Sequence, residues 1–314
     1  MQGKTDWIHT QNTEYFVLTQ MIIDNVHLFA GKDRENQLGG GTYAVAGMRL
    51  WSDKVGFCCR LGLDYDGNYE EWFSKNNIDM PKTRYPKKCV HADINYFEDG
   101  EREEILIPGC GNYMEMLPRF TEIPEDYLKC KGMYFYKDGE EAYWEEAENW
   151  FRGFSGISCW EIDSESARIE NKEAIAFCLP KVNLFSTNLT EGKRMTGKEK
   201  PVDIVKGLHD MGAGVLIFRM GEKGALVSDG KQIWHIPAVP VDVVDVTGGG
   251  NASTGGFLTG YCDSGGDIVY AGICAAISAS RIIAQYSVPA RFDEQLMIWA
   301  EKKAAEMKGK CKRI

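Results

Sequence analysis

A cluster of three glycines late in the chain is the feature that most directly suggests chemistry. It lies in Asp245-Val-Thr-Gly-Gly-Gly-Asn251, and the residues that follow it, Ala252–Tyr261, have a helical pattern. Bare backbone N–H groups at the start of a helix, together with the helix dipole, bind anions. The alternative is a tight turn before a crowded helix start, which seldom needs three glycines. The pattern therefore favours a site in which Gly248, Gly249 and Gly250 surround a phosphoryl group.

Two other glycine-rich segments imitate nucleotide-binding motifs. Gly39-x-Gly41-x-x-Ala44 fits a loose dinucleotide fingerprint, but a charged run precedes it where that motif requires a strand. The segment Gly192–Lys198 is one residue short of a P-loop, and Glu199 stands where Ser or Thr must bind magnesium. We therefore reject a Rossmann site and a P-loop at these positions.

The elements that must position the glycine cluster follow from the hydrophobic pattern. Short apolar runs rich in β-branched and aromatic residues alternate with longer helical patterns. The strand-like runs are Tyr15–Ile23, Val55–Leu61, Gly132–Tyr136, Ile157–Ile162 and Val215–Arg219. The helical runs are Tyr43–Leu50, Tyr69–Lys75, Ala142–Phe151 and Val202–Met211. This alternation predicts a mostly parallel, doubly wound sheet.

Two hairpin signals interrupt the alternation. The segment Val90–Ile107 has two strand-like runs around Asp99-Gly100, a dipeptide that suits a type I′ turn. A second hairpin signal spans Ala225–Ile236. Inserted hairpins are usually edge decoration, but the first lies between elements that would flank a substrate cleft. A lid is therefore the alternative for this hairpin.

The composition excludes several classes of partner. The 314 residues include 36 Lys and Arg against 46 Asp and Glu, and the formal net charge is −10. An acidic chain without a long basic stripe is not expected to bind nucleic acid. No apolar run is long enough to span a membrane, and the N-terminus lacks a signal-peptide pattern. We expect a cytoplasmic protein whose ten cysteines are reduced and whose cysteines and histidines have no zinc-binding spacing.

Taken in order, these features resemble the ribokinase (PfkB) family of carbohydrate and nucleoside kinases, over about residues 16–290. The block PAVPVDVVDVTGGGNASTGGFLTGY is similar to the family's C-terminal signature, whose usual core is DTxGAGD followed by a helix. The block GGGTYAVAGMRLWSDKVGFCCRLGLDYDG matches the N-terminal signature more loosely. The TGGGN sequence resembles a divergent subgroup. The resemblance implies one ribokinase-like domain over residues 1–314, a three-layer α/β fold with a mostly parallel central sheet and a small β lid at about 25–38 and 89–107.

The resemblance also implies an ATP-dependent phosphotransferase that uses Mg²⁺ and acts on an alcohol group of a sugar or nucleoside, with a homodimer formed through the lid. The residues on the acceptor side would be Asp24, Gly40, Gly41, Thr42 and Arg102. The residues on the nucleotide side would be Asn188, Arg219, Gly221 and Gly224, with Glu191 at the metal. Two alternatives stay open: Asp24 as a strand-end cap, and Asn188 with Glu191 as caps of the following helix.

Three positions depart from the family pattern. Asn251 stands where the family has the aspartate that takes the proton from the attacking hydroxyl. An amide lacks that basicity, and loss of a general base typically costs about 10²–10⁴ in rate. Arg219 replaces the usual Thr or Ser, and Thr42 stands where many sugar kinases have a substrate-binding Asn. Because positioning and anion stabilisation carry most of phosphoryl transfer, the chain is either an active kinase or a weak or dead pseudokinase that binds nucleotide or sugar.

Overall fold

The structure is a computed structural model that describes residues 12–65, 67–98 and 102–314. A large sheet contains eleven strands and a small sheet contains four. The strands of the large sheet are β1 (Tyr15–Leu18), β4 (Val55–Leu61), β5 (Ile78–Asp79), β6 (Lys82–Arg84), β9 (Gly132–Lys137), β10 (Ile157–Ile162), β11 (Leu184–Asn188), β12 (Val215–Arg219), β13 (Ala225–Ser228), β14 (Ile233–Ile236) and β15 (Lys312–Arg313).

The large sheet has the order β15-β14-β13-β12-β11-β10-β9-β1-β4-β5. β5 pairs with the start of β4, and β6 pairs with its end. All pairs from β12 to β5, and the β4–β6 pair, are parallel. The remaining strands at the other edge, β13 to β15, are antiparallel and include the second hairpin signal of the sequence. The predicted doubly wound, mostly parallel sheet is confirmed.

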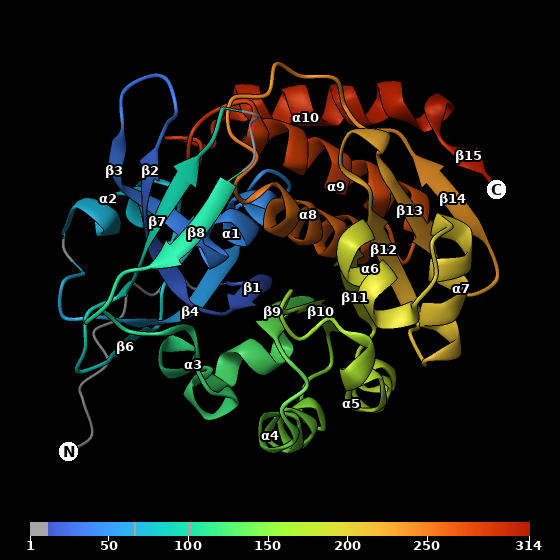
Figure 1. Ribbon diagram of the computed structural model, residues 1–314, viewed down its shortest axis with the longest axis horizontal. Coiled ribbons are helices and arrows are strands. Elements are labelled where there is room, and N and C mark those ends of the chain that lie inside the picture. The colour runs from blue at the N-terminus through green and yellow to red at the C-terminus, as the bar shows by residue number, and fades with distance from the viewer. Residues whose placement is uncertain (1–11, 66, 99–101) are drawn as a thin grey trace.

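Helices cover both faces of this sheet, which makes three layers (Figure 1). One layer contains α1 (Gly41–Arg49), α2 (Gly67–Lys75), α8 (Gly249–Asp263), α9 (Ile268–Ile283) and α10 (Glu294–Met307). The other contains α4 (Glu141–Phe151), α5 (Lys172–Cys178), α6 (Leu189–Thr196) and α7 (Pro201–Asp210). In the part of the chain that the structure describes, no helix is both long and apolar enough to cross a bilayer.

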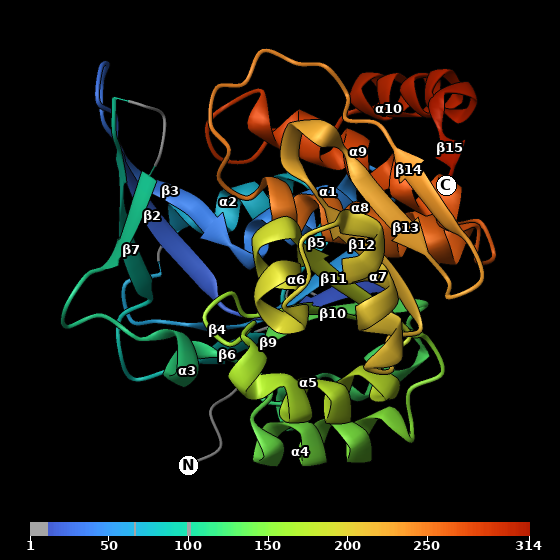
Figure 2. The same ribbon diagram turned by 45° about the vertical axis from the view of Figure 1, so that its right-hand side comes forward.

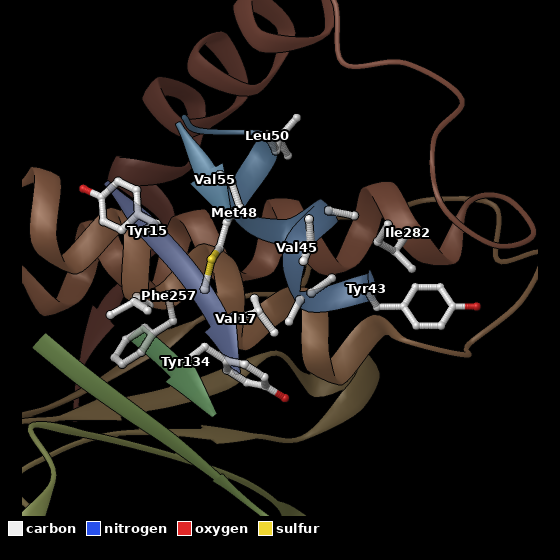
Figure 3. Close-up of a cluster of buried hydrophobic side chains, with 14 of the residues drawn as sticks. Tyr15, Val17, Tyr43, Val45, Met48, Leu50, Val55, Tyr134, Phe257 and Ile282 are labelled. Atoms are coloured by element: carbon white, nitrogen blue, oxygen red, sulfur yellow. The ribbon is translucent and has the colours of Figure 1, made fainter. Parts of the chain in front are cut away.

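The central strands are buried on both faces because two hydrophobic cores meet at the sheet. In β1, Tyr15 and Val17 belong to the core beneath α1 and α8, whereas Phe16 and Leu18 belong to the core beneath α4 and α5. Successive residues of β1 enter opposite cores. Because both cores are apolar, the sequence of the strand is a continuous apolar run rather than an alternating one. Figure 3 shows the first of these cores, in which Tyr134 of β9 packs with residues of β1, α1 and α8.

The small sheet projects from one side of the molecule (Figure 2). Its strands are β2 (Met21–His27), β3 (Arg34–Gly40), β7 (Val90–Tyr96) and β8 (Arg102–Leu106), in the order β3-β2-β7-β8. β7 and β8 pair antiparallel, which confirms the first predicted hairpin, although its Asp99-Gly100 turn lies outside the described residues. A short helix, α3 (Tyr113–Met116), follows β8.

The prediction of one strand over Tyr15–Ile23 is wrong, because the chain leaves the large sheet between β1 and β2. The break is at Thr19 and Gln20, where the Thr19 hydroxyl donates to the Gln20 side chain at 2.8 Å. The Gln20 carbonyl then accepts from the Gly41 N–H at 3.0 Å, where the chain returns from the small sheet into α1. Both halves of the run are buried, but in different sheets, so hydrophobicity alone does not reveal the break.

Glycines allow α1 and α8 to pack with their backbones in contact. A Cβ at Gly47 would lie 2.1 Å from the Ala252 carbonyl oxygen, and a Cβ at Gly255 would lie 2.3 Å from that of Ala44. Real Cβ atoms do not approach a backbone oxygen so closely, so any larger residue forces the helices apart. The two helices therefore cross in backbone contact at Gly47 of α1 and Gly255 of α8.

We predict that Gly255→Ala destabilises the protein. Overpacking typically costs about 1–3 kcal/mol, and the better helix propensity of alanine returns at most about 1 kcal/mol. We therefore expect a net loss of about 1–2 kcal/mol in the free energy of unfolding, measured by urea denaturation. Gly309→Ala is the matched control, because nothing lies within 4 Å of its added Cβ. Equal stability of the two variants would contradict the close helix contact.

Candidate active site

A cavity of about 730 Å³ lies between the small sheet and the carboxyl ends of the strands of the large sheet. This is where ligands bind in open α/β sheets. One wall contains residues of the small sheet and α3, among them Asp24, Ile94, Glu104 and Tyr113. The opposite end contains Gly248, Gly250, Asn251, Asn188, Glu191 and Arg219. The structure thus brings together most of the site residues predicted from the sequence.

The start of α8 is shaped by its glycines. Gly248 has φ 76°, and a Cβ there would lie 2.0 Å from Cγ of Tyr43, so this position requires glycine. Gly248 and Gly250 line the cavity. The first helical hydrogen bond runs from the Ala252 N–H to the Gly248 carbonyl at 2.9 Å, so the backbone N–H groups of Gly250 and Asn251 belong to the unpaired first turn of a helix.

Gly249 is placed differently from its two neighbours. It is buried, it is not among the residues that line the cavity, and its missing Cβ would lie 2.8 Å from Ile283 on α9. Its N–H is bonded within the turn, to the Val246 carbonyl at 3.3 Å. Gly249 therefore serves the packing of α8 on α9, and its role at the phosphoryl group remains a prediction.

Asn251 is the first member of a chain of hydrogen bonds. Its amide Nδ2 donates to the Tyr134 hydroxyl at 3.1 Å, and that hydroxyl donates to Oε2 of Glu161 at 3.0 Å. The other oxygen of Glu161, Oε1, pairs with Nη2 of Arg219 at 2.7 Å. The four residues come from α8, β9, β10 and β12, so the chain crosses the site along the ends of neighbouring strands.

In this hydrogen-bond chain, the negative charge of Glu161 is paired with the positive charge of Arg219. Burial raises the pKa of Tyr134 well above its usual range, and the neighbouring Glu161 carboxylate adds to the rise. Burial on its own would lower the pKa of Arg219, but the carboxylates of Glu161 and Glu191 outweigh it and the pKa is raised. Both shifts favour the neutral phenol of Tyr134 and the cationic form of Arg219.

Arg219 lies against the glycine turn. A Cβ at Gly250 would be 2.3 Å from Nη1 of Arg219, and the Arg219 Nε donates to the Thr187 carbonyl at 3.4 Å. The guanidinium therefore forms part of the cavity wall at the start of α8. A positive charge at a helix N-terminus strengthens an anion site.

Asn188 and Glu191 form the N-terminal cap of α6, which confirms the capping alternative. The Glu191 N–H donates to Oδ1 of Asn188 at 3.0 Å, and Oε2 of Glu191 accepts from the Asn188 N–H at 2.9 Å. Glu191 also accepts from the hydroxyls of Thr187 and Ser164, at 2.9 and 2.6 Å. Both residues still line the cavity, so the metal role of Glu191 and the nucleotide role of Asn188 remain predictions.

Asp24 lies in the middle of β2, so the strand-end cap alternative is wrong. The residue is 3% exposed and lines the cavity, and its carboxylate occupies the space that a side chain at Gly39 would need. Gly40 and Gly41 line the cavity as well. Thr42 does not line the cavity: it is fully buried, and among the described residues its hydroxyl has no hydrogen-bond partner. Arg102 begins β8, and its side chain is outside the described part of the chain.

Gly221 and Gly224 lie in the turn between β12 and β13 and are not among the residues that line the cavity. Gly224 has φ 81°, and a Cβ there would lie 2.1 Å from the Ile236 carbonyl oxygen. The backbone conformation of the hairpin thus accounts for Gly224. The contribution of both residues to nucleotide binding remains a prediction.

The sequence analysis missed the polar residues at the ends of β9 and β10. Tyr134 and Tyr136 alternate in β9, and each hydroxyl donates to a carboxylate of β10 or the residue after it, Glu161 at 3.0 Å and Asp163 at 3.1 Å. All four line the cavity. The available signal was the presence of polar residues at the carboxyl ends of two correctly placed strands, the position where parallel sheets bind ligands.

A hydrogen bond joins the small sheet to the loop before the glycines. The Tyr96 hydroxyl, at the end of β7, donates to Oδ1 of Asp245 at 2.5 Å. The same oxygen accepts from the Thr247 N–H at 2.7 Å. The two walls of the cavity are therefore linked at this point, and Asp245 supports the loop rather than facing the cavity.

Comparison with known proteins agrees with this geometry. The pfkB family carbohydrate kinase model matches residues 15–291. A cytidine kinase of Thermococcus kodakarensis is 29% identical over 251 residues, which cover 78% of this chain and 87% of that enzyme.

Two solved structures share the fold. One is an aminoimidazole riboside kinase of Salmonella enterica, complexed with aminoimidazole riboside and an ATP analogue (TM-score 0.72, 18% identity, 92% of this chain and 99% of that one). The other, designated a ribokinase II of E. coli, is in complex with ATP and Mg²⁺ (TM-score 0.71, 17% identity, 94% and 99%). The family match extends from β1 beyond α9 and contains both walls of the cavity, and on this evidence the chain is a kinase that belongs to the pfkB family of carbohydrate kinases.

Proposed function

We propose that the protein transfers the γ-phosphoryl group of ATP to an alcohol group of a sugar or nucleoside-like molecule. The observation that carries the proposal is one cavity with an anion-binding helix start at one end and a buried carboxylate, Asp24, on the opposite wall. Carboxylates accept hydrogen bonds from hydroxyl groups, and helix N-termini bind phosphates. The similarity to nucleoside kinases supports a nucleoside-like acceptor.

The charge of the acceptor wall narrows the choice of substrate. Asp24, Glu104, Asp138 and Asp163 line this part of the cavity. Lys137 is nearby, but its ammonium group is already paired with Asp138 at 3.0 Å and Glu140 at 2.7 Å. Among the described side chains of this wall, the negative charge exceeds the positive charge, and a substrate that carries a phosphate would be repelled. The proposed acceptor is therefore an uncharged or basic polyhydroxylated molecule.

The residues present fit a magnesium ion that arrives with the nucleotide. Within the described ranges, no group of three or more His, Cys, Asp or Glu residues could hold a metal ion. Mg²⁺ usually binds through substrate phosphates, several waters and one or two carboxylates. Glu191 would contact that hydration shell at the cavity wall, and the bound ion would neutralise charge on the phosphates.

In the proposed reaction the protein mainly orients the reactants. Asp24 holds the acceptor, while the backbone N–H groups at Gly250 and Asn251 face the transferred phosphoryl group, whose charge they stabilise. The acceptor hydroxyl oxygen forms a bond to Pγ, the bond from Pγ to the bridging oxygen breaks, and ADP leaves. This loose transition state requires little from a base. A protein that binds nucleotide without turnover is the alternative that Asn251 favours, and the acceptor assay below decides between the two.

The cellular setting is part of the proposal. The ten cysteines of the chain are free thiols in the structure, seven of them buried, which suits a reducing compartment such as the cytoplasm. A homodimer through the small sheet, where Phe29 and Phe97 are exposed, is also proposed. Light scattering of the purified protein tests the dimer.

We predict that ATP with Mg²⁺ raises the melting temperature. A ligand that binds only the native state stabilises it by RT ln(1 + [L]/Kd), which is about 2.7 kcal/mol at 100 Kd. Differential scanning fluorimetry with ATP, ATP with Mg²⁺, and Mg²⁺ alone measures the effect. The absence of a shift at millimolar nucleotide under all three conditions would contradict a nucleotide site.

We predict that phosphotransfer from labelled ATP favours unphosphorylated sugars and nucleosides over the corresponding phosphates by about tenfold or more in kcat/KM. The reason is repulsion between the substrate phosphate and the carboxylates of the acceptor wall, which is only partly screened in a cavity. A panel of paired substrates tests this. Faster turnover of a sugar phosphate would contradict the assignment of the acceptor wall, and binding without turnover of any acceptor would favour the pseudokinase.

A further inference from the structure

Asn251, which replaces the expected base, makes a hydrogen bond that requires the amino group of its amide. A tyrosine hydroxyl has a single hydrogen, and the Tyr134 hydroxyl donates it to the Glu161 carboxylate, which can only accept. The oxygen of Tyr134 can therefore only accept from a further neighbour. The Nδ2 group of Asn251 supplies that donor at 3.1 Å, and this fixes the orientation of the amide. Oδ1 of Asn251 is left as a neutral acceptor on the residue that lines the cavity.

An aspartate at position 251 would not fit this arrangement. Its carboxylate would face the lone pairs of the Tyr134 oxygen, because the only hydroxyl hydrogen is already used by Glu161. It would also add a second negative charge close to Glu161, which is 4% exposed and pairs with Arg219 at 2.7 Å. Two buried hydrogen-bond acceptors that face each other with no hydrogen between them lower the stability of the folded protein.

Arg219, the cation of the hydrogen-bond chain, also contacts the glycine turn. Nη2 of Arg219 pairs with Glu161, whereas Nη1 lies against Gly250 at the start of α8. Glu161 thus connects Tyr134, the hydrogen-bond partner of Asn251, with Arg219 at the start of α8. Its two oxygens hold Tyr134 and Arg219 at once.

We propose that Asn251, Tyr134, Glu161 and Arg219 form a rebuilt catalytic centre, in which Oδ1 of Asn251 orients the acceptor hydroxyl without deprotonating it and Arg219 supplies positive charge to the transferred phosphoryl group. The inference rests on the proposed function. Tyr134 and Glu161 are positioning residues that act through their two neighbours. The acceptor keeps its proton while the new O–P bond forms and the bond to ADP breaks. The proton then passes to a non-bridging oxygen of the transferred group and from there to water.

A double-mutant cycle tests the direction of the hydrogen bonds. In the double variant Asn251→Asp with Glu161→Gln, every group finds a partner again: Tyr134 donates to Asp, accepts from the Gln amide, and the Gln carbonyl accepts from Arg219. The net charge is also unchanged. Asn251→Asp alone leaves two acceptors facing each other, and Glu161→Gln alone removes the carboxylate that pairs with Arg219. We expect each single variant to melt about 2–6 °C below the native protein and the double variant to recover most of that loss.

Measurements of kcat and of the KM for ATP distinguish a role in positioning the reactants from a role in stability alone. We expect each single variant to lose about tenfold or more in kcat with little change in the KM for ATP, and the double variant to regain part of kcat. Tyr134→Phe should lower kcat in the same way. Tyr143→Phe is its matched control, because Tyr143 is also buried and, among the described residues, its hydroxyl has no hydrogen-bond partner. We expect this control to retain native kcat and melting temperature.

Arg219 is tested by nucleotide binding, which does not depend on turnover. If Nη1 faces the γ-phosphate, the native protein should be stabilised more by ATP than by ADP, each with Mg²⁺. Arg219→Gln should lose that difference, and Arg219→Lys should retain part of it because it keeps the charge but not the planar fork. An unchanged difference between ATP and ADP in Arg219→Gln would overturn the role of Arg219.

The outcomes are distinguishable from a failure of the proposed function. If the native protein neither responds to nucleotide nor transfers phosphate, the proposed function fails, while the melting temperatures of the cycle still test the hydrogen-bond chain. The inference is overturned if Asn251→Asp alone equals or exceeds the native protein in stability and turnover. It is also overturned if the effects of Asn251→Asp and Glu161→Gln simply add.

Discussion

The backbone contact between α1 and α8 determines where the parts of the site lie. Helices normally pack with axes about 8–10 Å apart, a distance set by their side chains. Here Gly47 and Gly255 remove the side chains at the contact, and each faces a backbone carbonyl of the other helix. The starts of both helices then lie at the same cavity, one next to the return from the small sheet and the other next to the glycine turn. The acceptor wall and the phosphoryl end are thus held in a fixed relation.

The second organising feature is the distribution of charge along the carboxyl ends of the strands. At the phosphoryl end, Arg219, whose side chain is 12% exposed, pairs with Glu161 and lies near the carboxylate of Glu191. At the acceptor end, carboxylates outnumber cations among the side chains that the structure describes, and Lys137 pairs with Asp138 and Glu140. An unpaired buried charge is expensive, whereas one paired through good hydrogen bonds can be kept. The cavity therefore has an anion-binding end and a hydroxyl-binding end.

The sequence predicted the framework better than the site. β4, β10 and β12 have the bounds expected from their apolar runs, because burial on both faces leaves a strong signal in the sequence. The division of the first run into β1 and β2 left no such signal, since both halves are buried. At the site, the glycine turn and Asp24 were identified from the sequence, whereas Tyr134 and Glu161 were not. Their pairing depends on contact across two strands more than twenty residues apart in the chain.

The separate roles of the three glycines also required coordinates. Local sequence treats Gly248, Gly249 and Gly250 alike, but the backbone of a tight turn points them in different directions. Gly248 accommodates the Tyr43 ring, Gly249 faces Ile283, and Gly250 admits the Arg219 guanidinium. Each is therefore required to be small for a different reason, and only the outer two line the cavity.

The single hydrogen of the Tyr134 hydroxyl has a consequence for how this enzyme can evolve. Because Glu161 already uses that hydrogen, the residue at position 251 has to be a donor as long as Glu161 is retained. A lineage with this arrangement cannot regain an aspartate at 251 in one favourable step, since the intermediate sequence carries two facing acceptors. Asn251 is thus epistatically entrenched, because an exchange to aspartate requires a second change at Glu161.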